Sequence, residues 1–321
     1  MRDGKLLTIS IAAYNAESIL QNAVNSCVNI SDNKKNLLEI IIVNDGSKDN
    51  TLLVAKKFEE AYPDIVKVID KFNGGYGSTI NSSLEIAKGK YFRLLDADDL
   101  YDTKELERFI TYLQSDDSDL IITDFSECKP TETNIVKGVA GRRSGIIQIE
   151  DLDCNLAMHS TCYKTEVLRK SNLHLEEHCL YTDTEFVLYP MSAVKSVSYF
   201  ECNLYQYTLG VDGQSVSKIG RIKNYKDAIN LELRLLDFYK NNKNAKFHSL
   251  MLKKLFISYD FALQSTIMGD LSHKKEAIEF DNLIKREFKE IYYYENHRSL
   301  KLFRLNRKFM YPFYRWILLK Y

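Results

Sequence analysis

The sequence lacks several patterns that would assign it to a class of protein at once. Its 321 residues contain six scattered cysteines and no CxxC pair, so neither a zinc site nor a disulfide framework is indicated. No apolar run approaches the ~20 residues that a membrane-spanning helix needs. The first residues, MRDGKLLTISIAAYN, lack the long apolar core and the cleavage site of a signal peptide. We therefore expect free thiols in a cytoplasmic protein.

Two nucleotide-binding signatures are missing as well. The chain has no Walker A sequence, and the stretch NGGYGSTIN has Ile80 where a dinucleotide fingerprint has its third glycine. Net charge excludes no partner, because 44 Lys and Arg balance 44 Asp and Glu. A hydrophobic fraction of 45% is ample for a packed core, which argues against disorder.

Basic residues are concentrated at the end of the chain. Residues 297–321 contain seven Lys and Arg and no acid, which leaves 37 bases against 44 acids in the rest. Aromatic residues alternate with these bases, among them Phe313 and Trp316. Basic-aromatic helices bind anionic membrane surfaces, so we expect peripheral attachment at the inner face of the cell membrane. Packing on the rest of the chain, or in a homodimer, is the alternative, and nucleic-acid binding is not expected.

The first 125 residues alternate between strand-like and helical segments. Apolar strands are expected over 6–13, 38–43, 65–70, 91–96 and 119–125, and helices over 16–29, 48–62, 77–89 and 102–115. Nearly continuous apolar strands separated by amphipathic helices predict an α/β domain with a mostly parallel sheet covered on both faces.

The pattern changes in the second half of the chain. Residues 126–220 are less regular, and 195–217 within them indicate short strands and a Gly/Ser loop. Beyond them, helices are expected over 223–241, 246–268, 272–294 and 298–320. We therefore predict two domains, an α/β domain over 1–217 and a helical region over 218–321.

Polar or glycine-rich residues follow each of the first four predicted strands. In chain order they are Tyr14 and Asn15, then Asn44 to Ser47, then Lys71 to Gly75, and finally Asp96, Asp98 and Asp99. Ligands of open α/β sheets bind outside the carboxyl ends of the strands, so the four segments indicate one shared pocket. Ordinary turns, which also favour Asn, Asp and Gly, are the alternative.

The strongest of these signals is the stretch DADD. Asp96 and Asp98 lie two residues apart at the end of a strand, so their side chains can converge if the chain curls there. Mg²⁺ and Mn²⁺ prefer carboxylate oxygens and are often shared with substrate phosphates, and such a cation would offset the crowded negative charge. The alternative is a solvated turn in which Asp99 or Asp102 caps the next helix, and for Asp102 capping is preferred.

The stretch around DADD and four others together resemble the family 2 glycosyltransferases of the GT-A fold. They are SIAAYNAE (10–17), EIIIVNDGSKDNT (39–51), KFNGGYGSTIN (71–81), AKGKYFRLLDADD (87–99) and YTDTEF (181–186). The similarity extends over residues 5–217. It implies a Rossmann-like sheet and an inverting transfer of a hexosyl or N-acetylhexosaminyl group. The donor would be a UDP-sugar, and the acceptor a hydroxyl of a glycan or lipid-linked glycan in bacterial-type polysaccharide or glycoconjugate synthesis.

The resemblance also implies roles for individual residues. Asp96 and Asp98 would hold Mn²⁺ or Mg²⁺, and Asp183 would be the general base. His159 matches a position beside the acceptor pocket, with a purely structural histidine as the alternative. Gln214 and Ser215 match a loop that folds over the donor. The implied nucleotide-sugar contacts are Ala13, Tyr14, Glu17, Asp45, Lys71, Asn73, Gly77, Asp96, Ala97 and Asp98.

The chemistry fits these residue types, although the chain departs from the family pattern twice. A hydroxyl is a poor nucleophile until a carboxylate takes its proton, and a divalent cation stabilises a leaving diphosphate. However, Thr182 replaces the acid that usually precedes the base, and Thr208 stands where the donor loop often has a basic residue. Asp183 could instead cap the helix that follows it. A non-catalytic nucleotide-sugar-binding partner of another glycosyltransferase is therefore the alternative function.

Overall fold

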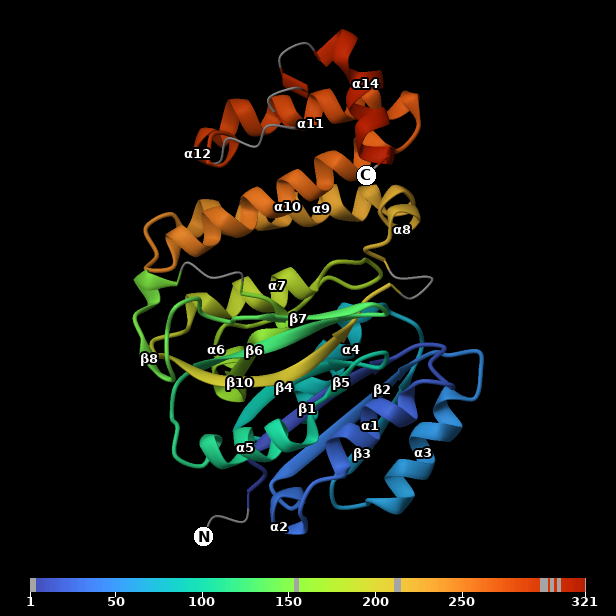
Figure 1. Ribbon diagram of the computed structural model, residues 1–321, viewed down its shortest axis with the longest axis vertical. Coiled ribbons are helices and arrows are strands. Elements are labelled where there is room, and N and C mark those ends of the chain that lie inside the picture. Colours follow the sequence, from blue (N-terminus) through green and yellow to red (C-terminus); the bar gives the residue numbers. More distant parts are fainter. Residues whose placement is uncertain are drawn as a thin grey trace. The chain divides into compact units, whose positions relative to one another are not determined.

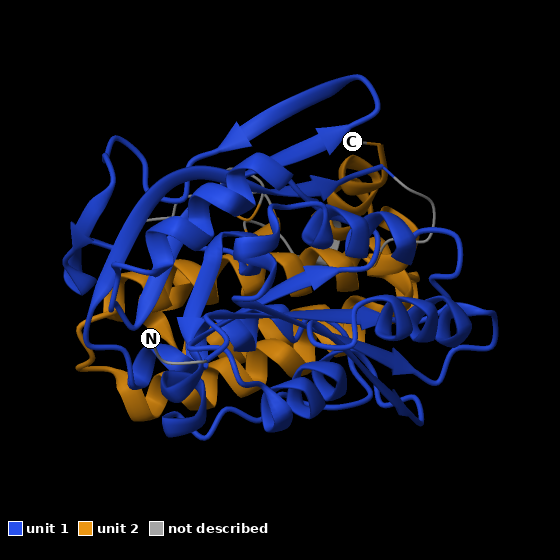
Figure 2. Cartoon of the chain, turned by 90° about the horizontal axis from the view of Figure 1, so that it is seen from below, with its two compact units in different colours: residues 1–210 blue, residues 211–321 orange. Residues whose placement is uncertain are grey.

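The computed structural model in Figure 1 describes residues 4–152, 156–210, 215–294, 300, 303–304 and 307–320. Its contacts divide the chain into two compact units, residues 1–210 and 211–321, which are called unit 1 and unit 2 below (Figure 2). That the first functional domain ends at residue 217 stays a prediction.

Unit 1 is built on one ten-stranded sheet. Its strands are β1 (Leu7–Ala13), β2 (Leu38–Asp45), β3 (Val66–Lys71), β4 (Tyr91–Asp96), β5 (Leu100–Tyr101), β6 (Leu120–Lys129), β7 (Glu132–Val136), β8 (Gly145–Ile147), β9 (Thr161–Lys164) and β10 (Val197–Thr208). The order is β3-β2-β1-β4-β9-β6-β10-β5, with β7 beside β6 and β8 beside β10. Strands β3, β2, β1 and β4 are parallel, as are β6 and β10, and antiparallel β9 joins the two groups.

Helices cover this sheet on both faces. They are α1 (Leu20–Val28), α2 (Asp32–Lys35), α3 (Thr51–Ala61), α4 (Tyr76–Ile86), α5 (Thr103–Leu113), α6 (Thr165–Lys170) and α7 (Asp183–Leu188), with short 3₁₀ turns η1 (Ile149–Asp151), η2 (Met158–Ser160) and η3 (Tyr189–Ser192). Helix α1 contacts α3 and α5, whereas α4 packs on β1 and β2 from the other side (Figure 1). The expected two-faced cover is therefore present.

Local sequence explains why these elements form where they do. Every residue of β2 is buried, as a parallel strand with neighbours on both sides and helices on both faces requires. Helix α5 begins after Asp102, whose carboxylate accepts hydrogen bonds from the backbone N–H groups of Lys104 and Glu105. The capping role predicted for Asp102 is thus confirmed.

One segment differs from the sequence expectation. Residues predicted as short strands within 195–217 form a single strand, β10, which spans 12 residues. Its pairing with β6 shifts register between Phe200 and Asn203 and again between Asn203 and Tyr205. Such irregularities interrupt the two-residue alternation of a strand, so one long strand looks like several short ones in the sequence.

Unit 2 is helical, as predicted. Its helices are α8 (Lys218–Lys223), α9 (Tyr225–Asn242), α10 (His248–Met268), α11 (Lys274–Glu287), α12 (Lys289–Tyr292) and α14 (Arg307–Lys320), with a 3₁₀ turn η4 (Leu271–His273). The helix expected over 272–294 is divided at Phe288, where φ is −132° and ψ is 59°. Among the helices described in either unit, none combines the length and apolar character needed to cross a bilayer.

Candidate active site

The carboxyl ends of β3, β2, β1 and β4 lie side by side at one edge of the sheet. These strands are consecutive and parallel, and their ladders pair Asp45 with Lys71 and Ala12 with Asp96. The four polar segments that follow the strands therefore converge at this edge. This is the place where open α/β sheets bind ligands.

The loop after β3 holds the carboxylate of Asp45, the last residue of β2. Lys71 Nζ and the N–H of Gly74 each donate to Oδ1 at 2.9 Å, and the N–H of Gly75 donates to Oδ2 at 2.8 Å. Oδ2 accepts no second hydrogen bond from the described residues. Because a carboxylate oxygen can accept two, this buried acid retains capacity for one N–H of a ligand.

Two glycines of this loop are required by its geometry. Gly75 has a φ of +82°, in the left-handed region that favours glycine. Gly77 packs so closely that an added Cβ would lie 2.2 Å from the carbonyl oxygen of Glu176. The side-chain amide of Asn73 donates to the Asp45 carbonyl at 2.9 Å and further orders the loop. Packing alone thus requires glycine at 77, and its contact with a nucleotide stays a prediction.

The loop after β1 is fastened to the loop after β2. Both carboxylate oxygens of Glu17 accept hydrogen bonds from Asn50, one from its backbone and one from its side chain, at 3.0 Å each. Those bonds hold the pKa of Glu17 below its usual value. Ala13 is buried, whereas Tyr14 is 50% exposed at the end of β1. Of these residues, Tyr14 has a side chain free to meet a ligand, while Glu17 braces the two loops.

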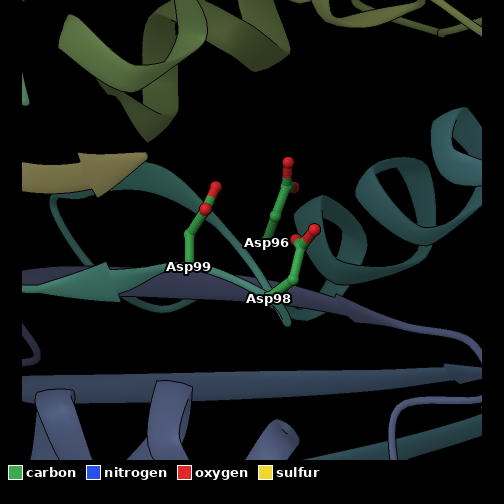
Figure 3. Close-up of side chains that lie close together, drawn as sticks. All are labelled: Asp96, Asp98 and Asp99. Atoms are coloured by element: carbon green, nitrogen blue, oxygen red, sulfur yellow. The ribbon is translucent and has the colours of Figure 1, made fainter. Parts of the chain in front are cut away.

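Three carboxylates gather in the turn after β4, called the acidic turn below. One carboxylate oxygen from each of Asp96, Asp98 and Asp99 lies within 4.8 Å of the others, and Figure 3 shows the side chains pointing to the same side of the turn. Asp98 is exposed, Asp96 is partly buried and Asp99 is buried, while Ala97 between them is also buried. The predicted convergence of Asp96 and Asp98 is therefore present, with Asp99 as a third member.

Asp99 is anchored in a way that the sequence did not predict. Its Oδ2 accepts a hydrogen bond from the Tyr205 hydroxyl at 2.6 Å, and its Oδ1 accepts one from the Thr208 N–H at 2.7 Å. Tyr76, the first residue of α4, donates its hydroxyl hydrogen to Asp96 Oδ1 at 2.7 Å. Asp99 thus ties the acidic turn to β10 and does not cap α5. The sequence signal that could have indicated this anchor is the pair Tyr205 and Tyr207, which lie two residues apart and therefore on one face of a strand.

Crowding and burial change the pKa values in this cluster. Burial, reinforced by the charge of Asp99, raises the pKa of Asp96 well above its usual range. Burial also raises the pKa of Asp99 to about 7, although hydrogen bonds from Tyr205 and Thr208 oppose the shift. Both shifts mean that full ionisation of this cluster is unfavourable unless positive charge is supplied.

Asp183 lies within electrostatic range of the acidic turn. Burial and nearer charged groups are the larger causes of the raised pKa values of Asp96, Tyr76 and Tyr207. The charge of Asp183 adds to each of these shifts. Asp183 is the first residue of α7, and the N-cap position before it belongs to Thr182. Residues 183 and 96, far apart in the sequence, therefore interact electrostatically within unit 1.

His159 lies in an aromatic cluster next to this region. Its ring stacks on Tyr207 with a centroid distance of 4.2 Å and meets the rings of Tyr205 and Phe125 at 4.7 and 5.2 Å. Since Tyr205 also anchors Asp99, the cluster connects His159 to the acidic turn. Of the two predicted loop residues, Ser215 belongs to unit 2, and Gln214 lies outside the described residues.

The α/β sheet with acids gathered at its carboxyl edge and the helical region after it agree with the predicted GT-A fold. The crystal structure of S. aureus TarS 1–349 in complex with UDP-GlcNAc is similar to this chain, with a TM-score of 0.67 and 17% sequence identity. The similarity covers 89% of this chain and 82% of that one. A TarS structure in complex with UDP matches with a TM-score of 0.63. The predicted fold class is thus confirmed.

The chain belongs to glycosyl transferase family 2, because the sequence profile of that description matches residues 8–171. Among its relatives is the minor teichoic acid biosynthesis protein GgaB of Bacillus subtilis, which is 26% identical over 246 residues. Another is the uncharacterized glycosyltransferase MG060 of Mycoplasma genitalium, which is 35% identical over 125 residues. The predicted family and the predicted glycosyltransferase class are therefore confirmed.

These relatives are longer than the region they share with this chain. The match to GgaB covers 74% of this chain but 27% of GgaB, and the match to MG060 covers 38% of this chain and 42% of MG060. The chain thus spans less than half of either relative.

Proposed function

We propose that the protein transfers a hexosyl or N-acetylhexosaminyl group, with inversion, from a UDP-sugar to a hydroxyl of a glycan or lipid-linked glycan. The similarity to TarS structures in complex with UDP-GlcNAc and UDP supports the donor class. The similarity to GgaB supports a role in the synthesis of a surface polysaccharide or glycoconjugate.

The observation that carries this proposal is the meeting of two separate groups of acids. Asp183 of α7 lies within electrostatic range of Asp96, although the two residues come from distant parts of the chain. An inverting transfer needs a base at the acceptor hydroxyl and charge stabilisation at the leaving diphosphate. Two acidic groups can divide these roles, much as two carboxyl groups do in glycoside hydrolysis.

The nucleotide would bind along the ends of β3, β2 and β1. Asp45 Oδ2 retains capacity to accept an N–H of the base, and Lys71 beside it holds the carboxylate in its orientation. The half-exposed ring of Tyr14 offers a surface on which a base can stack. The remaining proposed nucleotide-sugar contacts are Ala13, Glu17, Asn73, Gly77 and Ala97.

Asp96 and Asp98 are the proposed ligands of Mn²⁺ or Mg²⁺, and the residues present fit such an ion. Asp96 Oδ1 accepts from Tyr76, but its Oδ2 and both oxygens of Asp98 accept no hydrogen bond from the described part of the chain. Both oxygens of Asp99 are already engaged, which suits an anchor better than a ligand. When bound, a divalent cation would neutralise charge that develops on the leaving diphosphate.

Asp183 is the proposed general base. Its carboxylate would accept the proton of the acceptor hydroxyl as that oxygen attacks the anomeric carbon from the face opposite the diphosphate. His159, held in its aromatic cluster, would line the acceptor side. Contacts of Gln214 and Ser215 with the diphosphate or acceptor are part of the same proposal.

A panel of UDP-hexoses and UDP-N-acetylhexosamines tests the proposal. UDP release should require Mn²⁺ or Mg²⁺, stop with a chelator, and fall by about 100-fold or more in Asp98→Asn, because a charge-stabilising group is lost. Asp32→Asn, which changes an exposed acid of α2, is the matched control and should retain full activity.

Two results would contradict the proposal in different ways. Turnover that needs no metal and is unchanged in Asp98→Asn would refute the proposed cation site, but not the proposed glycosyltransferase activity. Tight UDP binding by calorimetry, with no turnover of any donor across a broad acceptor panel, would favour the non-catalytic binding partner instead.

A further inference from the structure

Helix α14 presents aromatic residues on two opposite faces. Tyr311 and Tyr314 are fully buried, and their ring centroids lie 6.3 and 5.7 Å from that of Phe303. Phe313 and Trp316 are 48% and 54% exposed and stack on each other at 6.0 Å. Positions three residues apart share one side of a helix, so the exposed pair forms a continuous outer surface.

The inner face of α14 is fixed within unit 2 by polar contacts. Arg315 Nε donates to the carbonyl oxygen of Gly269 at 2.6 Å, and Lys218 Nζ donates to the carbonyl oxygen of Leu319 at 2.9 Å. These bonds place α14 beside α8 and beside Gly269 at the end of α10, two residues before η4. The exposed pair is therefore presented in a definite orientation and is not a loose tail.

Further apolar side chains are exposed on the two neighbouring segments. Ile219 follows Lys218 in α8 and is 82% exposed, and Leu271 in η4 is 57% exposed. Lys320 lies four residues beyond Trp316, and its Nζ is 5.1 Å from the Trp316 ring centroid. We call Ile219, Leu271, Phe313, Trp316 and Lys320 the aromatic-basic face.

The charges around this face favour one kind of partner. Lys218 on α8 and Lys320 at the end of α14 are exposed bases. Asp270 is an exposed acid, and its carboxylate caps η4 by accepting from the Ser272 N–H. A second copy of this face would bring bases against bases. An anionic lipid surface offers opposite charge together with an apolar layer for the aromatic rings.

We propose that the aromatic-basic face binds the surface of anionic lipid bilayers. Phe313 and Trp316 insert at the level of the headgroups, Ile219 and Leu271 extend the apolar contact, and Lys320 meets the lipid phosphates. Such attachment would hold unit 2 at a membrane surface without any spanning helix. The proposal does not depend on the reaction that unit 1 catalyses.

Trp316 is the only tryptophan in the chain, so its fluorescence reports directly on this face. Addition of phosphatidylglycerol-containing vesicles should shift the emission to shorter wavelength, and brominated lipids should quench it. Pure phosphatidylcholine vesicles should have a much smaller effect. Raising the ionic strength should weaken the response, because salt screens the attraction of exposed charges.

A double variant with a matched control distinguishes vesicle binding by this face from nonspecific binding. Phe313→Ser with Lys320→Glu retains the Trp316 reporter and should weaken vesicle binding by about 10-fold or more. Ile135→Ser with Ile146→Ser removes two exposed apolar side chains of unit 1 and should bind vesicles normally. Circular dichroism confirms that both variants are folded.

Three outcomes would overturn the proposal. The first is an unchanged Trp316 emission with anionic vesicles, and the second is equal binding by the two double variants. The third is an emission shift that depends on protein concentration without lipid, together with a doubled mass in light scattering, which would assign the face to self-association.

Discussion

Asp281 in unit 2 and the acidic turn in unit 1 differ in how their charge is balanced. In unit 2, Asp281 is fully buried but meets Arg304, with Nε 3.3 Å from Oδ1, and the Tyr259 hydroxyl. In unit 1, no salt bridge reaches the acidic turn from the described part of the chain, and Asp98 is exposed. An acid that the chain itself neutralises serves the fold. Acids that gather at an open strand end without a basic partner are suited to bind a positively charged ligand from solution.

The largest effect is expected in unit 1, from removal of the proposed general base. Asp183→Asn should lower kcat by about 10²- to 10⁴-fold, because the acceptor hydroxyl then has no group to take its proton. UDP affinity, measured by calorimetry, should change little. Glu166→Gln on the exposed surface of α6 is the control. Full activity in a folded Asp183→Asn would refute the assignment of the base but not the family.

On the unit 2 side, the buried ion pair should matter for stability. Arg304→Met leaves buried Asp281 without its ion-pair partner, which should cost about 3–5 kcal/mol of unfolding free energy in denaturant titrations. Arg286→Met, which removes an exposed arginine paired with Glu287, should cost less than about 1 kcal/mol. If the two variants are equally stable, Asp281 is not neutralised by Arg304 and the contrast between the units fails.

A smaller effect is expected from the hydroxyl that orients Asp96. Tyr76→Phe removes the hydrogen bond to Oδ1 and should raise the Mn²⁺ or Mg²⁺ concentration for half-maximal UDP release by about 10-fold. Tyr112→Phe removes a comparable bond to Asp116, away from the acidic turn, and should leave the metal dependence unchanged. Equal metal dependence of both variants would mean that Tyr76 does not position the acid.

The sequence predicted what depends on local pattern and missed what depends on distant pairing. Apolar strands, amphipathic helices and the cap at Asp102 follow from residues close together in the chain, and all are found. Insertion of β9 between β4 and β6, and the single long β10, depend on which segments pair in space. A four-residue strand between a 3₁₀ turn and a six-residue helix carries too little periodicity to be recognised.

The candidate site shows the same division. Asp96 and Asp98 could be singled out because two acids follow one apolar strand. Tyr76 and Tyr205 could not, because their roles come from hydroxyl groups that reach across the fold to other segments. The carboxylate of Glu17, a predicted nucleotide contact, also accepts hydrogen bonds from Asn50, and no spacing in the sequence reveals that contact.

The smallest predicted effect concerns an acid of unit 2 that lacks a partner. Glu232 is fully buried in α9, and neither carboxylate oxygen has a hydrogen-bond partner among the described residues. Burial raises the pKa of Glu232 well above its usual value. The folded state therefore favours the protonated form, so wild-type stability should decrease as pH rises above the ordinary pKa of glutamate. Glu232→Gln removes this titration.

The melting temperatures of wild type and Glu232→Gln should consequently be similar near pH 4 and diverge as pH rises, with the variant more stable by about 1 kcal/mol or more at neutral pH. Glu279→Gln, which alters an exposed acid of α11, should show no such divergence. A constant difference at every pH would mean that the pKa of Glu232 is the same in the folded and the unfolded protein, and that burial does not raise it.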